Sequence, residues 1–282
     1  QIRYIYEKKP VSFEKVVGRL SGEDRFLAAH RLRLEHQGLT AGLGEGVVAN
    51  RKFVDNLATW VPWPYYWTQW AHLQSKYVAN DDVNAFAFVQ GSYETPNGWL
   101  IAAEIMVDDM PHWIGVTQMF QMAGQARLEV PVTQESQLAV QYARANNYTY
   151  AFQASQGDYT HHGYCLGSPF GPDNDELLVT YEFPRTRWGF TAVGLSLRRQ
   201  GEGTYGDVWE HEGYEASKDK TFLSGTVEHT QLVFAKASYG ISDNLELNVS
   251  FGVGPVQNAK NRPGYNKVHP EGAIEIRYHI NR

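Results

Sequence analysis

Cysteine is nearly absent from this chain, because its 282 residues contain only Cys165. A single cysteine excludes an intramolecular disulfide and any zinc or iron–sulfur site built from several thiolates. Long apolar runs are also missing, since no stretch approaches the about 18 consecutive apolar residues of a transmembrane helix. Positive charge is not in excess: 25 Lys and Arg stand against 31 Asp and Glu, a net charge of −6. This balance argues against a partner rich in nucleic-acid phosphates.

Aromatic residues and glycine are abundant instead. The chain has 8 Trp, 17 Tyr, 13 Phe and 26 Gly, and its mean hydropathy is −0.44. So many aromatic residues are not compatible with a disordered chain. Without a leucine-rich helical pattern, this composition is typical of an outer-membrane β-barrel, whose strands are apolar on one face only.

Alternation of apolar and polar residues is the main secondary-structure signal. Within 245–253, for example, every second residue is apolar and the residues between are polar or glycine. The sequence predicts twelve strands of 8 to 13 residues, near 26–36, 38–49, 84–93, 97–107, 121–131, 136–144, 147–155, 176–183, 187–199, 227–239, 244–253 and 271–280. These lengths bracket the about 9–11 residues of a tilted membrane-spanning strand. The predicted fold is therefore an all-β, antiparallel transmembrane barrel that forms one domain over 1–282.

The predicted connections support this interpretation. If the C-terminus lies in the periplasm, the external connections are the long ones, 156–175, 200–226 and 254–270, and the internal ones are short. Long external and short internal connections are the rule for outer-membrane barrels. The same count places 50–83 and 108–120 on the inner side.

The inner segment 50–83 is predicted to form a periplasmic plug with a short helix after Pro64. Prolines at 62 and 64 forbid a continuing central strand there. Its aromatic side chains form too large an apolar surface to stay exposed. They include Trp60, Trp63, Tyr65, Tyr66, Trp67 and Trp70.

Several short motifs, in order along 24–282, resemble the capsule assembly Wzi family. They are Ala29-His30-Arg31-Leu32, Gly44-Glu45, Asp81 with Asn84, Ala103-Glu104 leading to Val107-Asp108-Asp109, Leu166-Gly167, Gly171-Pro172-Asp173-Asn174-Asp175-Glu176-Leu177, and Arg198-Arg199-Gln200-Gly201. The resemblance implies an outer-membrane barrel of about eighteen strands, closed by periplasmic helices, that acts as a surface lectin for capsular polysaccharide. Members of the family have more of the barrel before the Ala-His-Arg-Leu segment, so the resemblance implies that the first strands are missing from this sequence. It also places Glu45, Glu104, Asp108 and Asp109 in family motifs.

Glycan binding is the chemistry that the predicted external connections favour. Sugars are bound by aromatic faces together with a few polar groups, and acidic sugars favour Arg. The connection 254–270 is basic in an otherwise acidic chain. The candidate glycan-binding residues are Arg198, Arg199, Tyr205, Trp209, His211, Tyr159, Tyr164, Arg262, Tyr265 and Lys267, with Lys260 nearby.

Other motifs are weaker. The glycine-rich run 42–46 is interpreted as part of a kinked strand rather than a phosphate-binding loop, because no helix pattern follows it. Glu104 and Asp108 are predicted to lie about 13 Å apart on one strand face. That separation is too large for glycoside hydrolysis, so these carboxylates are predicted to be polar lumen residues, together with Glu45 and Asp109. Two groups of potential metal ligands are interpreted as ordinary loop residues: His161, His162 and Cys165, and the acidic run 173–176. No metal or cofactor is expected.

The function predicted from the sequence is non-enzymatic binding or anchoring of an acidic capsular or surface polysaccharide in the outer membrane. The expected partners are that polysaccharide, outer-membrane lipid and other envelope proteins, with no nucleic acid. Two alternatives remain. One is an outer-membrane porin or glycan channel, and the other is a soluble β-sandwich carbohydrate-active protein.

Overall fold

The computed structural model describes residues 2–50, 84–109, 121–150, 158–184, 186, 188–204, 222–242 and 244–278. Within these ranges thirteen strands form one antiparallel sheet. They are β1 (Ile2–Lys8), β2 (Val11–Arg19), β3 (Arg25–His36), β4 (Leu39–Asn50), β5 (Asn84–Glu94), β6 (Leu100–Asp109), β7 (Gln121–Pro131), β8 (Gln137–Ala145), β11 (Asn174–Glu182), β12 (Trp188–Gln200), β13 (Glu228–Ser242), β14 (Leu245–Gln257) and β15 (Lys267–Tyr278). The prediction of an all-β fold with antiparallel strands is confirmed.

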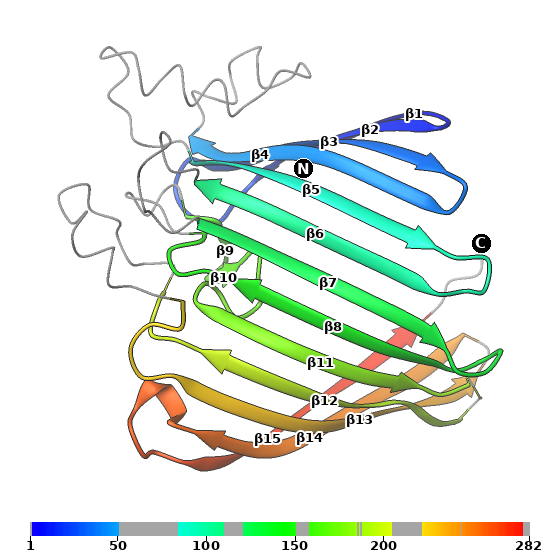
Figure 1. The fold of residues 1–282 in the computed structure, drawn as a ribbon, viewed down its shortest axis with the longest axis vertical. Helices are drawn as coiled ribbons and strands as arrows, with labels where there is room; N and C mark the ends of the chain where they lie inside the picture. Colours follow the sequence, from blue (N-terminus) through cyan, green and yellow to red (C-terminus); the bar gives the residue numbers. More distant parts are fainter. Residues whose placement is uncertain are drawn as a thin grey trace.

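The sheet is a continuous up-and-down meander, in which each strand pairs with its neighbours along the chain (Figure 1). Between β8 and β11, the short strands β9 (Thr160–His161) and β10 (Tyr164–Cys165) form a separate hairpin. A single 3-10 turn, η3 (Ala259–Asn261), follows β14. Figure 1 shows that the sheet curls, so that β15 passes behind β12 to β14. In the described ranges no pairing joins β1 to β15, and the sheet is open.

No helix in the described part of the chain is long and apolar enough to cross a membrane.

Eleven of the twelve predicted strands overlap strands of the sheet, namely β3 to β8 and β11 to β15. The strand predicted at 147–155 is wrong where the structure describes it, because residues 147–150 form a turn. Tyr148 and Tyr150 have φ angles of 62° and 73°, which a strand does not allow. The carboxylate of Asp108 accepts the backbone N–H of Tyr150 at 2.7 Å, a tertiary contact that alternation cannot reveal. The prediction also omits β1 and β2.

Because residues 147–150 form a turn and not a strand, every connection before residue 147 lies at the opposite edge of the sheet from the predicted one. In a meander, successive connections alternate between the two edges of the sheet. One edge, the turn edge, carries the short connections 9–10, 37–38, 95–99, 132–136, 183–187 and 243–244. The other, the long-connection edge, carries 20–24, 51–83, 110–120, 146–173, 201–227 and 258–266.

The long connections are thus collected at one edge, and β4 ends and β5 begins there. Placing 50–83 and 108–120 at the opposite end from 200–226 is therefore wrong. The physical reason is that one extra strand inverts the direction of every strand before it. The predicted plug itself, with Trp60, Trp63, Tyr66, Trp67 and Trp70, lies outside the described residues.

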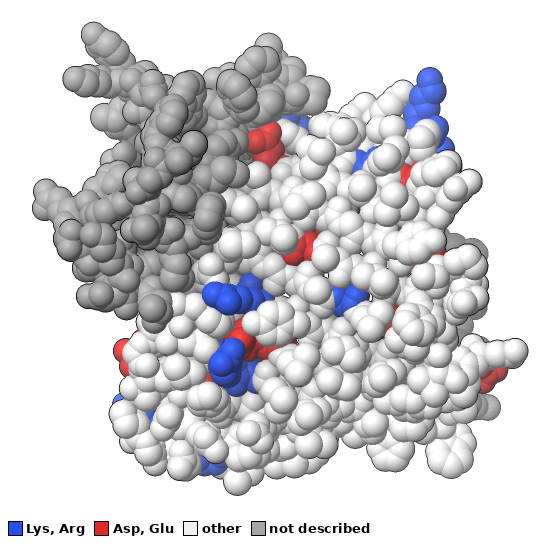
Figure 2. Space-filling view, in the orientation of Figure 1, with Lys and Arg blue, Asp and Glu red and all other residues white. Residues whose placement is uncertain are grey.

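One face of the sheet is apolar from strand to strand. Directly paired residues point to the same side of a sheet, so the register assigns each residue to a face. Figure 2 shows this face, which is almost free of charge over most of its area. Ile101 and Val233 on it are 52% and 63% exposed. One row across the sheet runs through Tyr93, Ile101, Leu128, Val140, Val179, Leu195, Val233, Val253 and Pro270.

Aromatic side chains border this apolar face at the turn edge. Trp188, the first residue of β12, is 72% exposed and lies opposite Tyr239 of β13. Tyr278, the last residue of β15, is exposed at the same edge, as is Trp99 in the connection before β6. Exposed aromatic rings therefore form a border along the short turns.

The opposite face is polar. One row on it runs through Gln90, Glu104, Gln125, Ala143, Glu176, Arg198 and Thr230. On this face the glycines of β4 leave room for aromatic rings of β5. A Cβ atom on Gly46 would lie 2.3 Å from the Phe86 ring, and one on Gly44 would lie 2.5 Å from the Phe88 ring. The glycine-rich run is thus part of a strand and serves packing.

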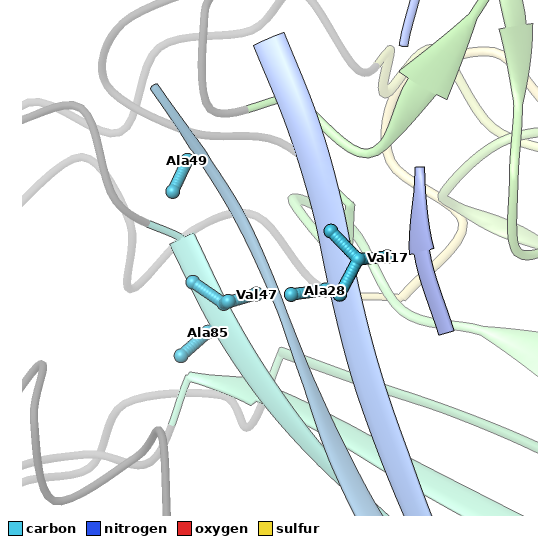
Figure 3. Close-up of a cluster of buried hydrophobic side chains, with 5 residues drawn as sticks. All are labelled: Val17, Ala28, Val47, Ala49 and Ala85. Atoms are coloured by element: carbon cyan, nitrogen blue, oxygen red, sulfur yellow. The ribbon is translucent and has the colours of Figure 1, made fainter. Parts of the chain in front are cut away.

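Small side chains are buried on the apolar face where β2 to β5 reach the long-connection edge. Val17, Ala28, Val47 and Ala85 form one row across four neighbouring strands, with Ala49 beside it (Figure 3). All five are at most 7% exposed. The apolar face is thus buried at this corner and exposed over most of the remaining sheet.

Candidate functional site

The described part of the connection between β8 and β11 crosses the polar face of the sheet. We name residues 146–150 and 158–173 the bridging segment. The segment first contacts β6, where the backbone N–H of Tyr150 donates to the Asp108 carboxylate. It then contacts β5, where the Tyr159 ring packs edge-on against Phe86, with ring centroids 4.7 Å apart. Tyr150 and Tyr159 also stack at 6.0 Å, and burial raises the pKa of both phenols. Tyr159 therefore packs against the sheet, and a glycan contact through this residue stays a prediction.

The tip of the bridging segment reaches the connection between β2 and β3. His161 accepts the backbone N–H of Ser21 through Nδ1 at 2.9 Å. The Arg25 guanidinium donates to the carbonyl oxygens of Asp158 and Thr160. These contacts join residues more than 130 positions apart and span β4 to β7. The bridging segment thus covers the polar face near the long-connection edge.

Cys165 lies on β10 within this packed region, beside Ala123, Ala145 and Tyr150. Burial raises the pKa of the thiol from its ordinary 9.0 to about 11. Because only the thiolate reacts, alkylation of Cys165 at pH 8 is expected to be about 100-fold slower in the folded protein than in the unfolded chain. Iodoacetamide labelling followed by mass spectrometry measures this ratio. Equal rates in the folded and unfolded protein would contradict the burial of the thiol.

Asp173 joins two connections at the long-connection edge, 146–173 and 201–227. It is fully buried, and its carboxylate accepts the backbone N–H groups of Gly203 at 3.0 Å and Leu223 at 2.8 Å. The backbone N–H and the hydroxyl of Ser224 donate to the same carboxylate. Its own N–H donates to the Asn146 carbonyl at 3.2 Å. A carboxylate with this many donors organises backbone rather than ligating a metal.

The side chains of the acidic run 173–176 do not point the same way, because β11 begins at Asn174 and its successive residues alternate between the two faces of the sheet. Asp175 lies on the apolar face with Arg199, whereas Glu176 lies on the polar face and accepts the hydroxyl of Ser196 at 2.6 Å. Asp173 is occupied by backbone donors. Among the described residues, no three His, Cys, Asp or Glu side chains gather in a way that could hold a metal ion.

Arg198 and Arg199 also point to opposite faces. The Arg198 guanidinium lies 4.2 Å from the centroid of the Phe170 ring and 3.8 Å from Glu228 Oε1. Arg199 instead donates through Nε to Asp175 Oδ1 at 3.0 Å. The prediction that both arginines serve one glycan site is therefore wrong, because successive residues of a strand alternate between faces.

The connection between β14 and β15 is fixed by asparagine side chains. Asn261 Nδ2 donates to the carbonyl oxygens of Gln200 at 2.9 Å and Thr226 at 2.8 Å. Asn258 Nδ2 donates to the Val227 carbonyl at 3.1 Å. Both asparagines have positive φ angles, 51° and 56°, which Asn tolerates better than most residues. This connection is thus held against the one between β12 and β13.

This fixed connection presents basic and aromatic side chains to solvent, and we name residues 258–267 the basic platform. Lys260, Arg262 and Lys267 are exposed, and Tyr265 is 48% exposed. The residues that the structure describes place no carboxylate within ion-pair distance of these three cations. The platform contains no Asp or Glu. It therefore brings together three of the predicted glycan-binding residues, Arg262, Tyr265 and Lys267.

Other predicted residues lie apart. Tyr164 is 77% exposed on β10. Tyr205, Trp209 and His211 lie outside the described residues, as does the side chain of Asp109. Asp108 is buried and holds the turn at Tyr150.

The sequence predicts that Glu45 and Glu104 are both lumen residues and so lie on the same face of the sheet. The structure places them on opposite faces. Glu45 lies on the apolar face, opposite Ala87, and its carboxylate is 3.0 Å from His30 Nε2. Glu104 lies on the polar face. The register of β4 against β5 separates these two carboxylates, and alternation within a single strand could not show this.

Two features are not predicted from the sequence: the contacts between arginine and phenylalanine side chains, and the turn that Asn258 and Asn261 build. The rings of Phe170 and Phe222 lie under the guanidinium groups of Arg198 and Arg144, the latter at 3.6 Å. No local pattern reports such long-range contacts. The turn built by Asn258 and Asn261 did have a signal, since Asn, Pro and Gly are dense at 258–264 and such residues favour turns.

The described residues define a class of protein: an all-β fold whose large antiparallel sheet has one apolar face, one polar face and long connections at one edge. Comparisons with protein-family models, with curated proteins and with solved structures find no match for this chain.

Proposed function

We propose that this chain forms an outer-membrane β-barrel that binds an acidic surface polysaccharide, in particular capsular polysaccharide, without an enzymatic step. The observation that carries the proposal is the continuous exposed apolar face of the sheet. Scattered apolar side chains are normal on soluble proteins, but a contiguous apolar surface of this extent marks contact with lipid or another apolar phase. A lipid-facing sheet of a barrel has this surface.

Two further observations support a membrane orientation. The exposed aromatic border at the turn edge, including Trp188 and Tyr278, matches the aromatic girdles at the interfaces of membrane barrels. The connections sort by length, because those at the turn edge have at most five residues and all the longer ones lie at the other edge. In outer-membrane barrels the long connections are extracellular, so the basic platform belongs to the outer surface.

The basic platform has the chemistry for an acidic glycan. Its exposed cations suit carboxylate groups, and the Tyr265 ring offers a face for a sugar. The asparagine hydrogen bonds fix the backbone before binding, which lowers the entropy lost on association. The resemblance to the capsule assembly Wzi family supports capsular polysaccharide as the ligand.

The alternative of an open porin is less well supported. The bridging segment covers the polar face between β8 and the connection of β2 and β3. In a closed barrel the polar face would line the lumen, so the bridging segment would obstruct its outer mouth.

Replacing Lys260 and Lys267 together by Gln is expected to weaken binding of alginate, an acidic polysaccharide, by about fivefold, because exposed charge pairs contribute little each. Wild-type binding is expected to fall as salt increases, since exposed charges are screened. Isothermal titration calorimetry or surface plasmon resonance with the purified full chain measures both effects.

The matched control replaces Lys8 and Lys9 by Gln, which removes the same charge at the turn edge. This control is expected to bind alginate like the wild type. If both double variants lose affinity equally, the platform is not the site. Equal binding of alginate and of neutral dextran would show that acidic groups are not recognised.

A further inference from the structure

A row of charged residues crosses the apolar face near the long-connection edge, on the side of the sheet opposite to the one that the bridging segment covers. The register pairs Arg144 of β8 with Asp175 of β11, Asp175 with Arg199 of β12, and Arg199 with His229 of β13. We name these four residues the charged row. Figure 2 shows charge gathered over the ends of β8, β11 and β12. A second row on this face, Lys15, His30 and Glu45, lies across β2 to β4.

The remaining residues that β8 and β11 to β15 place on this face carry no charge. The next row toward the turn edge runs through Tyr142, Leu177 and Leu197. Beyond it, apolar residues continue to Trp188 and Tyr239. The charged row is therefore a sharp boundary between an apolar surface and the long connections.

The charged row carries an excess of positive charge. Asp175 has a side chain only 4% exposed, and its carboxylate accepts Arg199 Nε at 3.0 Å and Tyr142 Oη at 3.0 Å. The side chain of Arg199 remains 48% exposed. Arg144 is exposed, and its guanidinium lies over the Phe222 ring at 3.6 Å. Two guanidinium groups thus stand against one carboxylate, and both present N–H donors at the surface.

The distance to the aromatic border fits the thickness of a membrane. Arg199 and Trp188 are the outer and inner ends of the apolar stretch of β12. Because of a β-bulge between Phe190 and Ala192, this stretch lies opposite ten residue steps of β13, from Tyr239 to His229. At about 3.3 Å per residue it is about 33 Å long. Tilted by about 40°, as in barrels, it spans about 25 Å, the height of the outward apolar band of outer-membrane barrels. The charged row then lies at the depth of lipid headgroups.

We propose that Arg144 and Arg199 in the charged row bind the phosphate group of an outer-leaflet lipid headgroup. This inference rests on the proposed membrane orientation and adds a second ligand, on the lipid-facing surface. Arg199 already donates to Asp175 through Nε and Nη2, and Arg144 donates to Asn146 through Nε. The remaining Nη N–H groups of the two guanidinium groups are the donors for the phosphate oxygens. The backbones of Arg144 and Arg199 lie two strand spacings apart, about 9.6 Å. Asp175, on the strand between them, orients the Arg199 guanidinium. A phosphate on the lipid side can reach both arginines without crossing the sheet.

The test uses the full chain in detergent micelles with phosphatidic acid as the probe, and native mass spectrometry counts the retained lipid. The wild type is expected to retain phosphatidic acid over phosphatidylcholine. Replacing Arg144 and Arg199 together by Gln is expected to lower the affinity for phosphatidic acid about tenfold, because hydrogen bonds to charged groups are lost. The control Arg127→Gln removes one arginine from the polar face, and its retention is expected to equal that of the wild type.

A second variant keeps the test informative if the double variant does not fold. Asp175→Asn removes the one carboxylate of the charged row and is expected to tighten phosphatidic acid binding about threefold. Unchanged retention in both variants would overturn the proposal. Full displacement of the lipid by an equal concentration of inorganic phosphate would assign the site to free phosphate and overturn the lipid assignment.

The outcome also separates this proposal from the proposed function. Insertion into vesicles without any preference for phosphatidic acid overturns the lipid site alone. A protein that remains monomeric without detergent and does not associate with vesicles overturns the membrane proposal as well.

Discussion

A chain with arginine in place of Val249 is expected to fail to insert into membranes, whereas arginine in place of the preceding Asn248 leaves insertion intact. Val249 lies on the apolar face between Ala237 and Ile274 and is 41% exposed. A charge there would cost about 2–4 kcal/mol near the middle of a bilayer. Asn248 pairs with Ser238 and Glu275 on the polar face, where a charge stays in a polar surrounding.

Flotation with liposomes after refolding measures the inserted fraction of each variant. The two variants differ only in the face that carries the arginine, so each is a control for the other. Equal insertion of Val249→Arg and Asn248→Arg would contradict the barrel. A wild-type protein that stays monomeric and folded without detergent would favour the soluble β-sandwich alternative.

The intact protein in a planar bilayer is expected to carry little steady current, and shortening the bridging segment is expected to produce an open channel. The variant replaces 158–165, which includes β9 and β10, by the two residues Gly-Ser. The contact of His161 with Ser21 and those of Asp158 and Thr160 with Arg25 are then lost. The segment then no longer spans the polar face, and single-channel recording measures the current that results.

A deletion of 133–135 in the connection between β7 and β8 provides the control, because it shortens a turn at the opposite edge. This control is expected to conduct as little as the wild type. Large steady currents from the wild type would favour the porin. Silence of the shortened variant, despite insertion into liposomes, would show that another part of the chain closes the lumen.

Sequence alternation predicted most of the sheet because it reports burial on one face of each strand. In β14, every second residue from Leu245 to Val253 is apolar, and the structure places these residues on the apolar face. Alternation failed at 147–155 because Tyr148 and Tyr150 are apolar in the pattern but adopt positive φ angles. There a contact with Asp108, more than forty residues away, decides the backbone conformation.

The site was predicted in part, for a related reason. The basic platform is a local feature, and its composition is visible in the sequence. The separation of Arg198 from Arg199 follows from strand geometry once 187–199 is taken as a strand. The role of Asp173 could not be predicted, because its donors, Gly203, Leu223 and Ser224, lie 30 to 51 residues away in sequence. Such contacts require the order of the strands to be known.

The bridging segment has a mechanical consequence. It ties the beginning of β3 to the end of β8 and the beginning of β11, while β4 to β7 form the arc between these points. It is therefore a chord across that arc, and for an arc of given length the chord fixes the radius. Withdrawal of the segment would not only uncover the polar face but also release the curvature of these four strands. One movement of the bridging segment would therefore change both the access to the concave side and the curvature of the sheet.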